Sequence, residues 1–253
     1  MDGIFQTTLR YQMTIIIPVY NEEENLDRLI STFMAYFAES TTKSKVLFID
    51  DGSTDHSFKK IEMVCAQEEN FEYIKFSRNF GLSSAIKAGI DHINTPLTGY
   101  IDADLQTSPF DFERLLNQMD GYTMILGYRG NRKDTFSKRL QSKIANTLRR
   151  YLINDGIIDT GCPLKIIKTA AAKKIPFFDG MHRFIPALIL LQKGSVKQVN
   201  VQHFPRLAGK SKFTLFNRSI KPLQDTFAFR WMRKRYINYA IELIKLKNVN
   251  INQ

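Results

Sequence analysis

The chain has 253 residues, of which 43% are hydrophobic, with a formal net charge of +11 and two cysteines. This size suits one large domain, and no apolar stretch approaches the roughly 20 residues that span a bilayer. Cys65 and Cys162 form no CxxC pair, and the N-terminus lacks the basic and apolar regions of a secretory signal. We therefore expect no disulfide framework, zinc site or transmembrane anchor, and we predict a cytoplasmic protein.

The first half of the chain alternates between strand and helix patterns. Continuous apolar runs predict buried strands at 13–20, 45–50, 71–77, 97–104 and 122–129. Apolar positions three or four residues apart predict helices at 22–37, 55–68, 81–93 and 108–119. We expect Asn21 to cap the first helix and Ser108 to cap the last, with Pro109 at its first position. The alternation predicts an α/β fold with a doubly wound, mostly parallel sheet.

The pattern changes after Arg129. Residues 137–153 are amphipathic, and the segments 159–168 and 196–206 resemble strands and loops that complete the sheet. The short apolar run 185–191 predicts buried core, and a further helix or two is predicted from Ser219 to about Lys247. No repeat or flexible linker divides the chain. We predict one domain over 13–217, followed by an amphipathic helical appendage over 218–253.

Polar clusters follow four of the predicted strands. In chain order they read "PVYNE", "DDGSTD", "RNFG" and "DADLQ". In open parallel sheets the ligand lies outside the carboxyl ends of the strands, where such loops meet. The sequence therefore predicts one binding site assembled from successive loops at one edge of the sheet.

Two carboxylates in the fourth cluster indicate a cation. Asp102 and Asp104 are two residues apart, so on an extended chain both side chains leave the same face. Neighbouring carboxylates repel each other unless a cation lies beside them. Hard oxygen ligands select Mg²⁺ or Mn²⁺, which fill their remaining positions with substrate phosphates and water. One acid capping the next helix and the other facing solvent is the alternative, and the three neighbouring polar loops favour the metal.

Six motifs together resemble a known family. They are "PVYNEEENL", "FIDDGSTD", "RNFGLSSAIKAGI", "YIDADLQTSP", "ILGYR" and "RLAGKSKF". In this order and spacing they are similar to the family-2 glycosyltransferases of the GT-A fold, and among them to the dolichyl- or polyprenyl-phosphate sugar synthases, including dolichol-phosphate mannosyltransferases. The resemblance implies an inverting, metal-dependent enzyme. Its donor would be a UDP- or GDP-linked sugar, and its acceptor a polyprenyl phosphate such as undecaprenyl or dolichyl phosphate.

The resemblance also implies roles for individual residues. Those expected around the nucleotide base and ribose are Pro18, Tyr20, Glu22, Ile49 and Asp51. Those expected at the metal and diphosphate are Asp102, Ala103, Asp104 and Gln106, with Asp102, Asp104 and Gln106 as metal ligands. Those expected at donor or acceptor phosphates are Arg129, Arg206, Ser211 and Lys212. Asp104, Arg129, Arg206 and Lys212 form the implied catalytic set.

The acceptor determines whether the enzyme needs a general base. A sugar hydroxyl requires one, whereas a phosphate monoester already carries about −1.5 to −2 charges at neutral pH. Family members that act on hydroxyls usually carry a Glu-Asp pair where this chain has Met181 and His182. This favours a phosphate acceptor. The alternative is a hydroxyl-directed enzyme of surface polysaccharide or glycolipid synthesis, with Asp159 or Asp179 as the base.

A basic block lies near the end of the chain. Between Arg206 and Arg235 there are nine Lys or Arg residues and one acid, Asp225, interleaved with aromatic residues. This composition suits a membrane interface or a nucleic-acid surface. No nucleic-acid-binding motif is present, and the acidic sheet edge would repel a polyanion, so we expect no nucleic-acid partner. We predict peripheral attachment to the cytosolic face of a membrane through residues 213–240, with room for a membrane-protein partner in trans.

Overall fold

The computed structural model of the chain describes residues 10–130, 152–205, 215–239 and 242. The first half contains β1 (Met13–Val19), α1 (Glu23–Glu39), β2 (Ser44–Asp50), α2 (Ser57–Gln67), β3 (Phe71–Lys75), α3 (Leu82–His92) and β4 (Leu97–Tyr100). The second half contains α4 (Asp111–Leu116), β5 (Met124–Tyr128), β6 (Lys165–Lys168), α6 (Thr169–Ala172), the 3-10 helix η1 (Met181–Phe184), α7 (Ile185–Leu191), β7 (Val196–Asn200) and α8 (Leu215–Arg235). The predicted alternation of strands and helices is confirmed.

The strands form one seven-stranded sheet in the order β3-β2-β1-β4-β6-β5-β7. Neighbouring strands are parallel except around β6, which is antiparallel to both β4 and β5. The predicted mostly parallel sheet is confirmed. The reversal at β6 places a late segment of the chain beside the end of β4.

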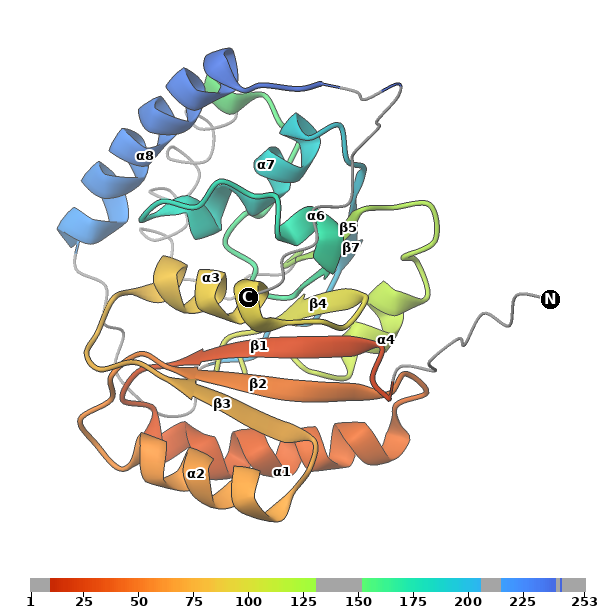
Figure 1. Cartoon of the computed structure of the whole chain (residues 1–253), viewed down its shortest axis with the longest axis vertical. Coiled ribbons are helices and arrows are strands. Elements are labelled where there is room, and N and C mark those ends of the chain that lie inside the picture. Colours follow the sequence, from red (N-terminus) through yellow and green to blue (C-terminus); the bar gives the residue numbers. More distant parts are fainter. Residues whose placement is uncertain (1–9, 131–151, 206–214, 240–241, 243–253) are drawn as a thin grey trace, which may run out of the picture.

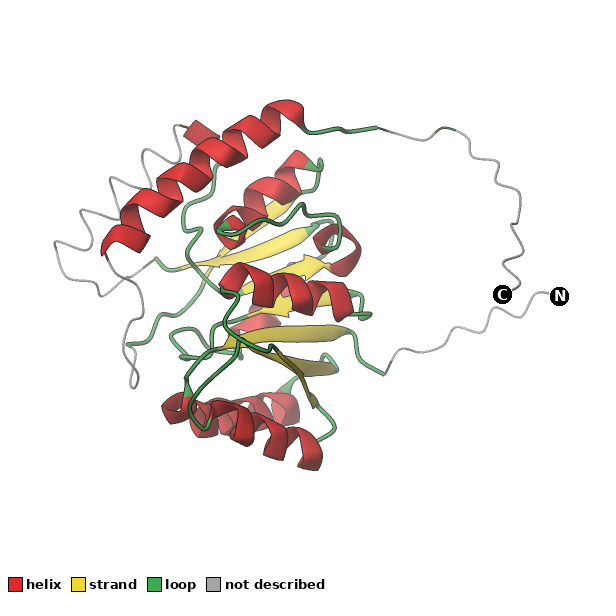
Figure 2. Cartoon of the chain, turned by 60° about the vertical axis from the view of Figure 1, so that its left-hand side comes forward, coloured by secondary structure: helices red, strands yellow, loops and turns green. Residues whose placement is uncertain are grey.

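Helices cover both faces of the sheet. Figures 1 and 2 show α1 and α2 side by side on one face and α3 on the opposite face, while α8 lies at the far end of the molecule from α1 and α2. Within the described ranges, no helix combines the length and apolarity that crossing a membrane requires. The predicted α/β class with a C-terminal helix is thus confirmed.

The core explains why these segments fold as they do. Ile15, Ile16 and Ile17 of β1 are fully buried, as a strand covered on both faces requires. On α1, Leu29 and Phe33 are fully buried at helical spacing against the sheet. The predicted core run 185–191 forms α7, most of which is buried.

Two expectations about helix starts are wrong. Asn21 does not cap α1, because its backbone is left-handed (φ 51°) and its Oδ1 accepts the N–H of Thr54 at 2.8 Å. Helix α4 begins at Asp111 rather than at Pro109. The residues before it form a turn in which Ser108 Oγ accepts the N–H of Phe110 at 3.3 Å.

The extent of β4 also differs from the expectation. The strand ends at Tyr100, so Asp102 and Asp104 lie in a turn rather than on an extended chain. Most of the amphipathic segment 137–153 lies outside the described residues. The predicted boundary between 217 and 218 falls within α8, and the division into a domain and an appendage stays a prediction.

Candidate functional site

The carboxyl ends of β1, β2 and β3 meet at one edge of the sheet. Val19 pairs with Asp50, and Asp50 pairs with Lys75. The chain leaving β4 joins the same edge, because the N–H of Ile101 donates to the carbonyl of Ile16 at 3.3 Å. The polar loops predicted from the sequence are therefore brought together.

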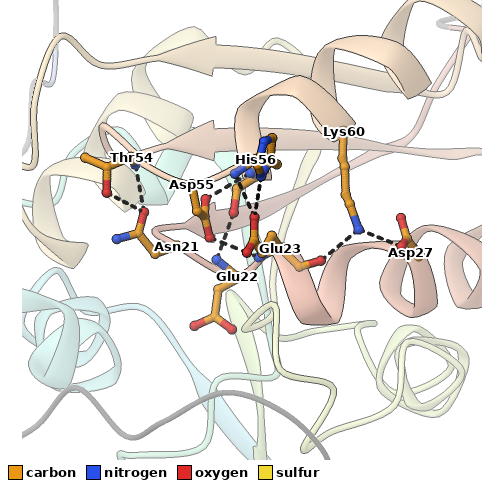
Figure 3. Close-up of polar contacts among 9 residues, drawn as sticks. Asn21, Glu22, Glu23, Asp27, Thr54, Asp55, His56 and Lys60 are labelled. Atoms are coloured by element: carbon orange, nitrogen blue, oxygen red, sulfur yellow. Dashed lines mark hydrogen bonds and ion pairs between the residues drawn. The ribbon is translucent and has the colours of Figure 1, made fainter.

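The loops after β1 and β2 are fastened to each other by a polar network (Figure 3). The N–H of Glu22 donates to Ser57 Oγ at 2.9 Å, and the N–H of Glu23 donates to Asp55 Oδ2 at 3.3 Å. In return, Glu23 Oε2 accepts the N–H of His56 at 2.8 Å. The carboxylate of Glu22 points away from this network in Figure 3 and accepts a hydrogen bond from Asn25 Nδ2 at 2.7 Å. The network fixes the first two loops of the site.

Asp51 holds the loop after β3. Its Oδ1 accepts the N–H of Phe80 at 2.7 Å and its Oδ2 accepts the N–H of Gly81 at 2.9 Å. Burial raises the pKa of Asp51, and the two N–H donors oppose that rise. Gly52 (φ 71°) permits the close approach, since a Cβ there would lie 2.3 Å from the carbonyl carbon of Arg78. Asp51, which is expected beside the nucleotide, therefore also fixes the shape of the loop after β3.

The other residues expected around the nucleotide lie at the same edge. Pro18 and Ile49 are register partners on β1 and β2. Tyr20, directly after β1, is half-buried, whereas Ile49 has no exposed surface. Ile49 could therefore contact a ligand only after rearrangement or through its backbone.

The acidic rim, which we define as Asp102 and Asp104, follows β4. Asp102 Oδ1 accepts a hydrogen bond from the Tyr100 hydroxyl at 2.6 Å, and Asp104 Oδ1 accepts the N–H of Gln106 at 3.1 Å. Asp104 is only 5% exposed. Burial raises the pKa of Asp102, and the negative charge of Asp104 raises it further. The two carboxylates are therefore close enough to repel, as the sequence predicts, although a turn brings them together.

The donor set of the acidic rim fits a hard divalent cation. It offers two carboxylates in one turn, and the backbone N–H of Gln106 donates to Asp104 Oδ1, which places Gln106 next to them in the chain. Among the residues that the structure describes, no three His, Cys, Asp or Glu side chains gather into a complete metal cage. The remaining coordination positions would fall to diphosphate oxygens and water, an arrangement that Mg²⁺ and Mn²⁺ accept.

Arg129 is paired with Asp159. Its Nε donates to Asp159 Oδ2 at 2.7 Å and its Nη2 donates to Oδ1 at 3.0 Å. The two side chains are 9% and 8% exposed. A carboxylate whose two oxygens accept an arginine fork is a poor proton acceptor. The pairing weakens the alternative in which Asp159 acts as a general base, and it leaves little guanidinium surface for a phosphate.

Lys165 is a member of the site that the sequence analysis missed. It is 2% exposed, its Nζ donates to the carbonyl of Cys162, and burial lowers its pKa. Its charge and that of Arg129 lower the pKa of Asp102, against the effects of burial and Asp104. The sequence does contain a signal for this residue, because Lys165 is the first position of an apolar strand. A lysine buried there is costly without a nearby acid, so its position indicates an acidic partner.

The segment at Met181 and His182 carries no carboxylate. Met181 is buried, and His182 Nδ1 is hydrogen bonded to Ser83 Oγ at 2.7 Å. Burial lowers the pKa of His182 to about 3, so the imidazole is neutral at physiological pH. Asp179, the other candidate base, is exposed just before this segment. Arg206, Ser211 and Lys212 lie outside the described residues.

The reversed β6 and the acidic rim at the carboxyl edge of a doubly wound sheet define the GT-A class of fold. A similar structure is that of glucosyl-3-phosphoglycerate synthase from Mycobacterium tuberculosis, solved with Mn²⁺, UDP-glucose and phosphoglyceric acid. The two structures superpose with a TM-score of 0.67 at 14% sequence identity, and the match covers 92% of this chain and 83% of that chain. S. aureus TarS 1–349 is also similar, with a TM-score of 0.55 at 17% sequence identity, and the match covers 76% of this chain and 60% of that chain.

Residues 14–176, more than half of the chain, match the model of the family described as Glycosyl transferase family 2. The chain therefore belongs to glycosyl transferase family 2. A curated relative, dodecaprenyl-phosphate galacturonate synthase from Rhizobium johnstonii, is 28% identical over 220 residues. The alignment covers 85% of this chain and 65% of that relative, so the chain spans less than two thirds of the relative's length.

Proposed function

We propose that the chain transfers a sugar, with inversion, from a nucleoside diphosphate donor to a polyprenyl phosphate. Three findings support the proposal: membership of glycosyl transferase family 2, the similarity to a dodecaprenyl-phosphate galacturonate synthase, and the acidic rim. Pro18, Tyr20, Glu22, Ile49 and Asp51 are the residues proposed around the nucleotide. A panel of UDP- and GDP-sugars distinguishes uracil from guanine as the base.

The pairing of Asp159 with Arg129 is the observation that favours a phosphate acceptor over a hydroxyl acceptor. A hydroxyl acceptor needs a basic group, whereas an ionised phosphate needs only positioning by cations. Asp159 is neutralised by a buried arginine, and His182 is too weak a base because its pKa is about 3. Both features suit an acceptor that arrives already charged. Exposed Asp179 stands as the base of the competing, hydroxyl-directed reaction.

The chain's own residues divide the reaction between two tasks. Asp102, Asp104 and Gln106 would hold the divalent cation and face the donor diphosphate. When bound there, Mg²⁺ or Mn²⁺ would supply the positive charge that stabilises the departing nucleoside diphosphate. Arg206, Ser211 and Lys212 are proposed to hold the acceptor phosphate, and Arg129 to maintain positive charge behind the site. Because the acceptor attacks as an anion, no side chain is required to remove a proton.

Helix α8 is proposed to lie on the membrane that contains the acceptor. Its inner face buries Thr226 and Phe229 against the domain, while Leu223, Phe227 and Trp231 are exposed on the outer face. Phe227 and Trp231 are 56% and 65% exposed, and Arg230, Lys234 and Arg235 are exposed basic residues on the same helix. Apolar rings flanked by cations suit an anionic lipid surface, at about 1 kcal/mol per basic residue. The cytosolic face and any membrane-protein partner are predictions of the same proposal.

A radiolabel assay tests the proposed reaction. The whole chain is incubated with a panel of UDP- and GDP-sugars and with undecaprenyl or dolichyl phosphate, with and without EDTA. We expect label to enter the organic phase from one donor, and only in the absence of EDTA. Transfer from no donor would contradict the proposal. Asp179→Asn separates the alternatives, because it should retain most transfer to a phosphate acceptor and abolish transfer to a hydroxyl.

A further inference from the structure

The hydroxyl of Tyr100 is engaged with one oxygen of the acidic rim. Tyr100 is the last residue of β4 and is 6% exposed, and its hydroxyl lies 2.6 Å from Asp102 Oδ1. The strand ends there, so Asp102 itself stands in the turn beyond the sheet. A tyrosine fixed in the sheet therefore holds a carboxylate on a loop.

Lys165 supports this tyrosine from the neighbouring strand. The two residues are register partners in the antiparallel pair β4–β6. Lys165 Nζ lies 5.1 Å from the centre of the Tyr100 ring, within cation–π range, and donates to the carbonyl of Cys162. Because both side chains are almost fully buried, the ring has little freedom to rotate. The position of the hydroxyl is thus fixed by the packing between the two strands.

We propose that Tyr100 is a positioning residue for the divalent cation: it binds Asp102 Oδ1 and leaves Oδ2 directed to the metal and the donor diphosphate. A group of this kind orients a metal ligand without touching the metal, and its removal typically weakens metal affinity by about 10- to 100-fold. The inference rests on the proposed function, since it requires the acidic rim to bind a cation.

Mn²⁺ binding measures the effect directly. Free Mn²⁺ is counted by electron paramagnetic resonance while the whole chain is titrated, once with UDP present and once with GDP. Tyr100→Phe removes the hydroxyl alone, and we expect it to raise the Kd for Mn²⁺ about 10-fold. In the transfer assay the same variant should need about 10-fold more Mn²⁺ for half-maximal activity, while kcat at saturating Mn²⁺ changes less than about twofold.

Tyr36→Phe is the matched control. Tyr36 is buried like Tyr100, and its hydroxyl also donates to a carboxylate, Glu113 Oε1 at 3.3 Å, between α1 and α4. A general loss of stability would affect both variants, whereas only Tyr100→Phe should change the affinity for Mn²⁺. Melting temperatures of both variants report how well each retains the fold.

The outcomes separate this inference from the proposed function. Asp102→Asn and Asp104→Asn should each abolish Mn²⁺ binding. If they do and Tyr100→Phe binds Mn²⁺ like the wild type, the positioning role is overturned while the metal site stands. If the wild type binds no Mn²⁺ with either nucleotide, the metal site of the proposed function is contradicted, and the positioning role of Tyr100 falls with it. If neither Tyr100→Phe nor Tyr100→Leu folds, Tyr100 is a structural residue and the inference is also overturned.

Discussion

The ring of Phe184 in η1 stacks on the ring of Phe229 in α8, with centroids 5.3 Å apart and planes 9° from parallel. Beside them, Arg183 Nη1 donates to Asp225 Oδ2 at 3.2 Å. The same η1 segment contacts α3 through His182 and Ser83. One short segment therefore joins the C-terminal helix to the half of the molecule that contains the predicted nucleotide site.

Removing the stacked ring should destabilise the protein. Phe229 is 1% exposed, so Phe229→Ala is expected to lower the free energy of unfolding by about 3–5 kcal/mol. Urea denaturation measures the change. Phe227→Ala, two residues away on the exposed face, is the control and should change stability by less than about 0.5 kcal/mol. Equal losses in the two variants would mean that α8 is not docked through Phe229.

A side chain at Gly180 is expected to destabilise the fold. Its φ is 85°, and a Cβ would lie 2.2 Å from Asp225 Oδ2. Gly121 has a similar φ of 74° with nothing within 4 Å of its Cβ position, so Gly121→Ala isolates the backbone cost, about 1–2 kcal/mol. Gly180→Ala should cost about 1–3 kcal/mol more, because Asp225 must move. Thermal unfolding compares the two; an equal loss would show that Asp225 adjusts freely.

His182 should make stability depend on pH. Its folded-state pKa is about 3, below the ordinary 6.5, so between these values the unfolded chain binds the proton and the folded chain does not. Stability is therefore lost as the pH falls from about 6.5 toward 3, by at most about 1.4 kcal/mol per pH unit. In His182→Asn this contribution is absent, so the stability difference between wild type and variant should shrink on acidification. A difference that stays constant from about pH 7 to 4.5 would contradict the assignment.

Reversing charge on α8 should weaken binding to anionic vesicles. Arg230, Lys234 and Arg235 are exposed, and their replacement by Glu is expected to reduce sedimentation with anionic liposomes by at least about 10-fold. Arg233 is left unchanged because its Nη1 donates to the carbonyl of Ile153.

The control for this experiment carries the same change in net charge elsewhere. Lys168, Lys173 and Lys174 are exposed around α6, and their replacement by Glu should leave vesicle binding largely intact. If both triple variants lose binding equally, attraction depends on overall charge and α8 is not the contact surface. If neither loses it, the proposed attachment is wrong.

Local patterns predicted most of the fold, because burial and periodicity act within single segments. The β-branched run of β1 and the apolar stripe of α1 are examples, and both elements lie where their patterns indicate. The gathering of four polar loops at one sheet edge followed from the same patterns, since parallel strands end together.

Pairings between distant residues could not be read from the sequence. The residues near Arg129 do not indicate that its guanidinium will pair with Asp159. Likewise, the residues near Tyr100 do not indicate that Lys165 will be its partner on the neighbouring strand. Both pairs depend on β6 running against its neighbours, a feature of topology rather than of local pattern. Asn21 is a related case: its backbone is left-handed, and its Oδ1 accepts the N–H of Thr54 from the loop after β2, a contact that the neighbouring residues do not indicate.

The placement of β6 also bears on how the chain is made. As the polypeptide leaves the ribosome, β1 to β4 can already pair with one another, but β5 is synthesised before both of its partners, β6 and β7. Until those later strands emerge, β5 has no neighbour in the sheet and the open edge of β4 stays uncovered. Such unpaired edges favour association between nascent chains. The nascent chain therefore exposes unpaired strand edges from the synthesis of β4 until β6 and β7 have joined the sheet.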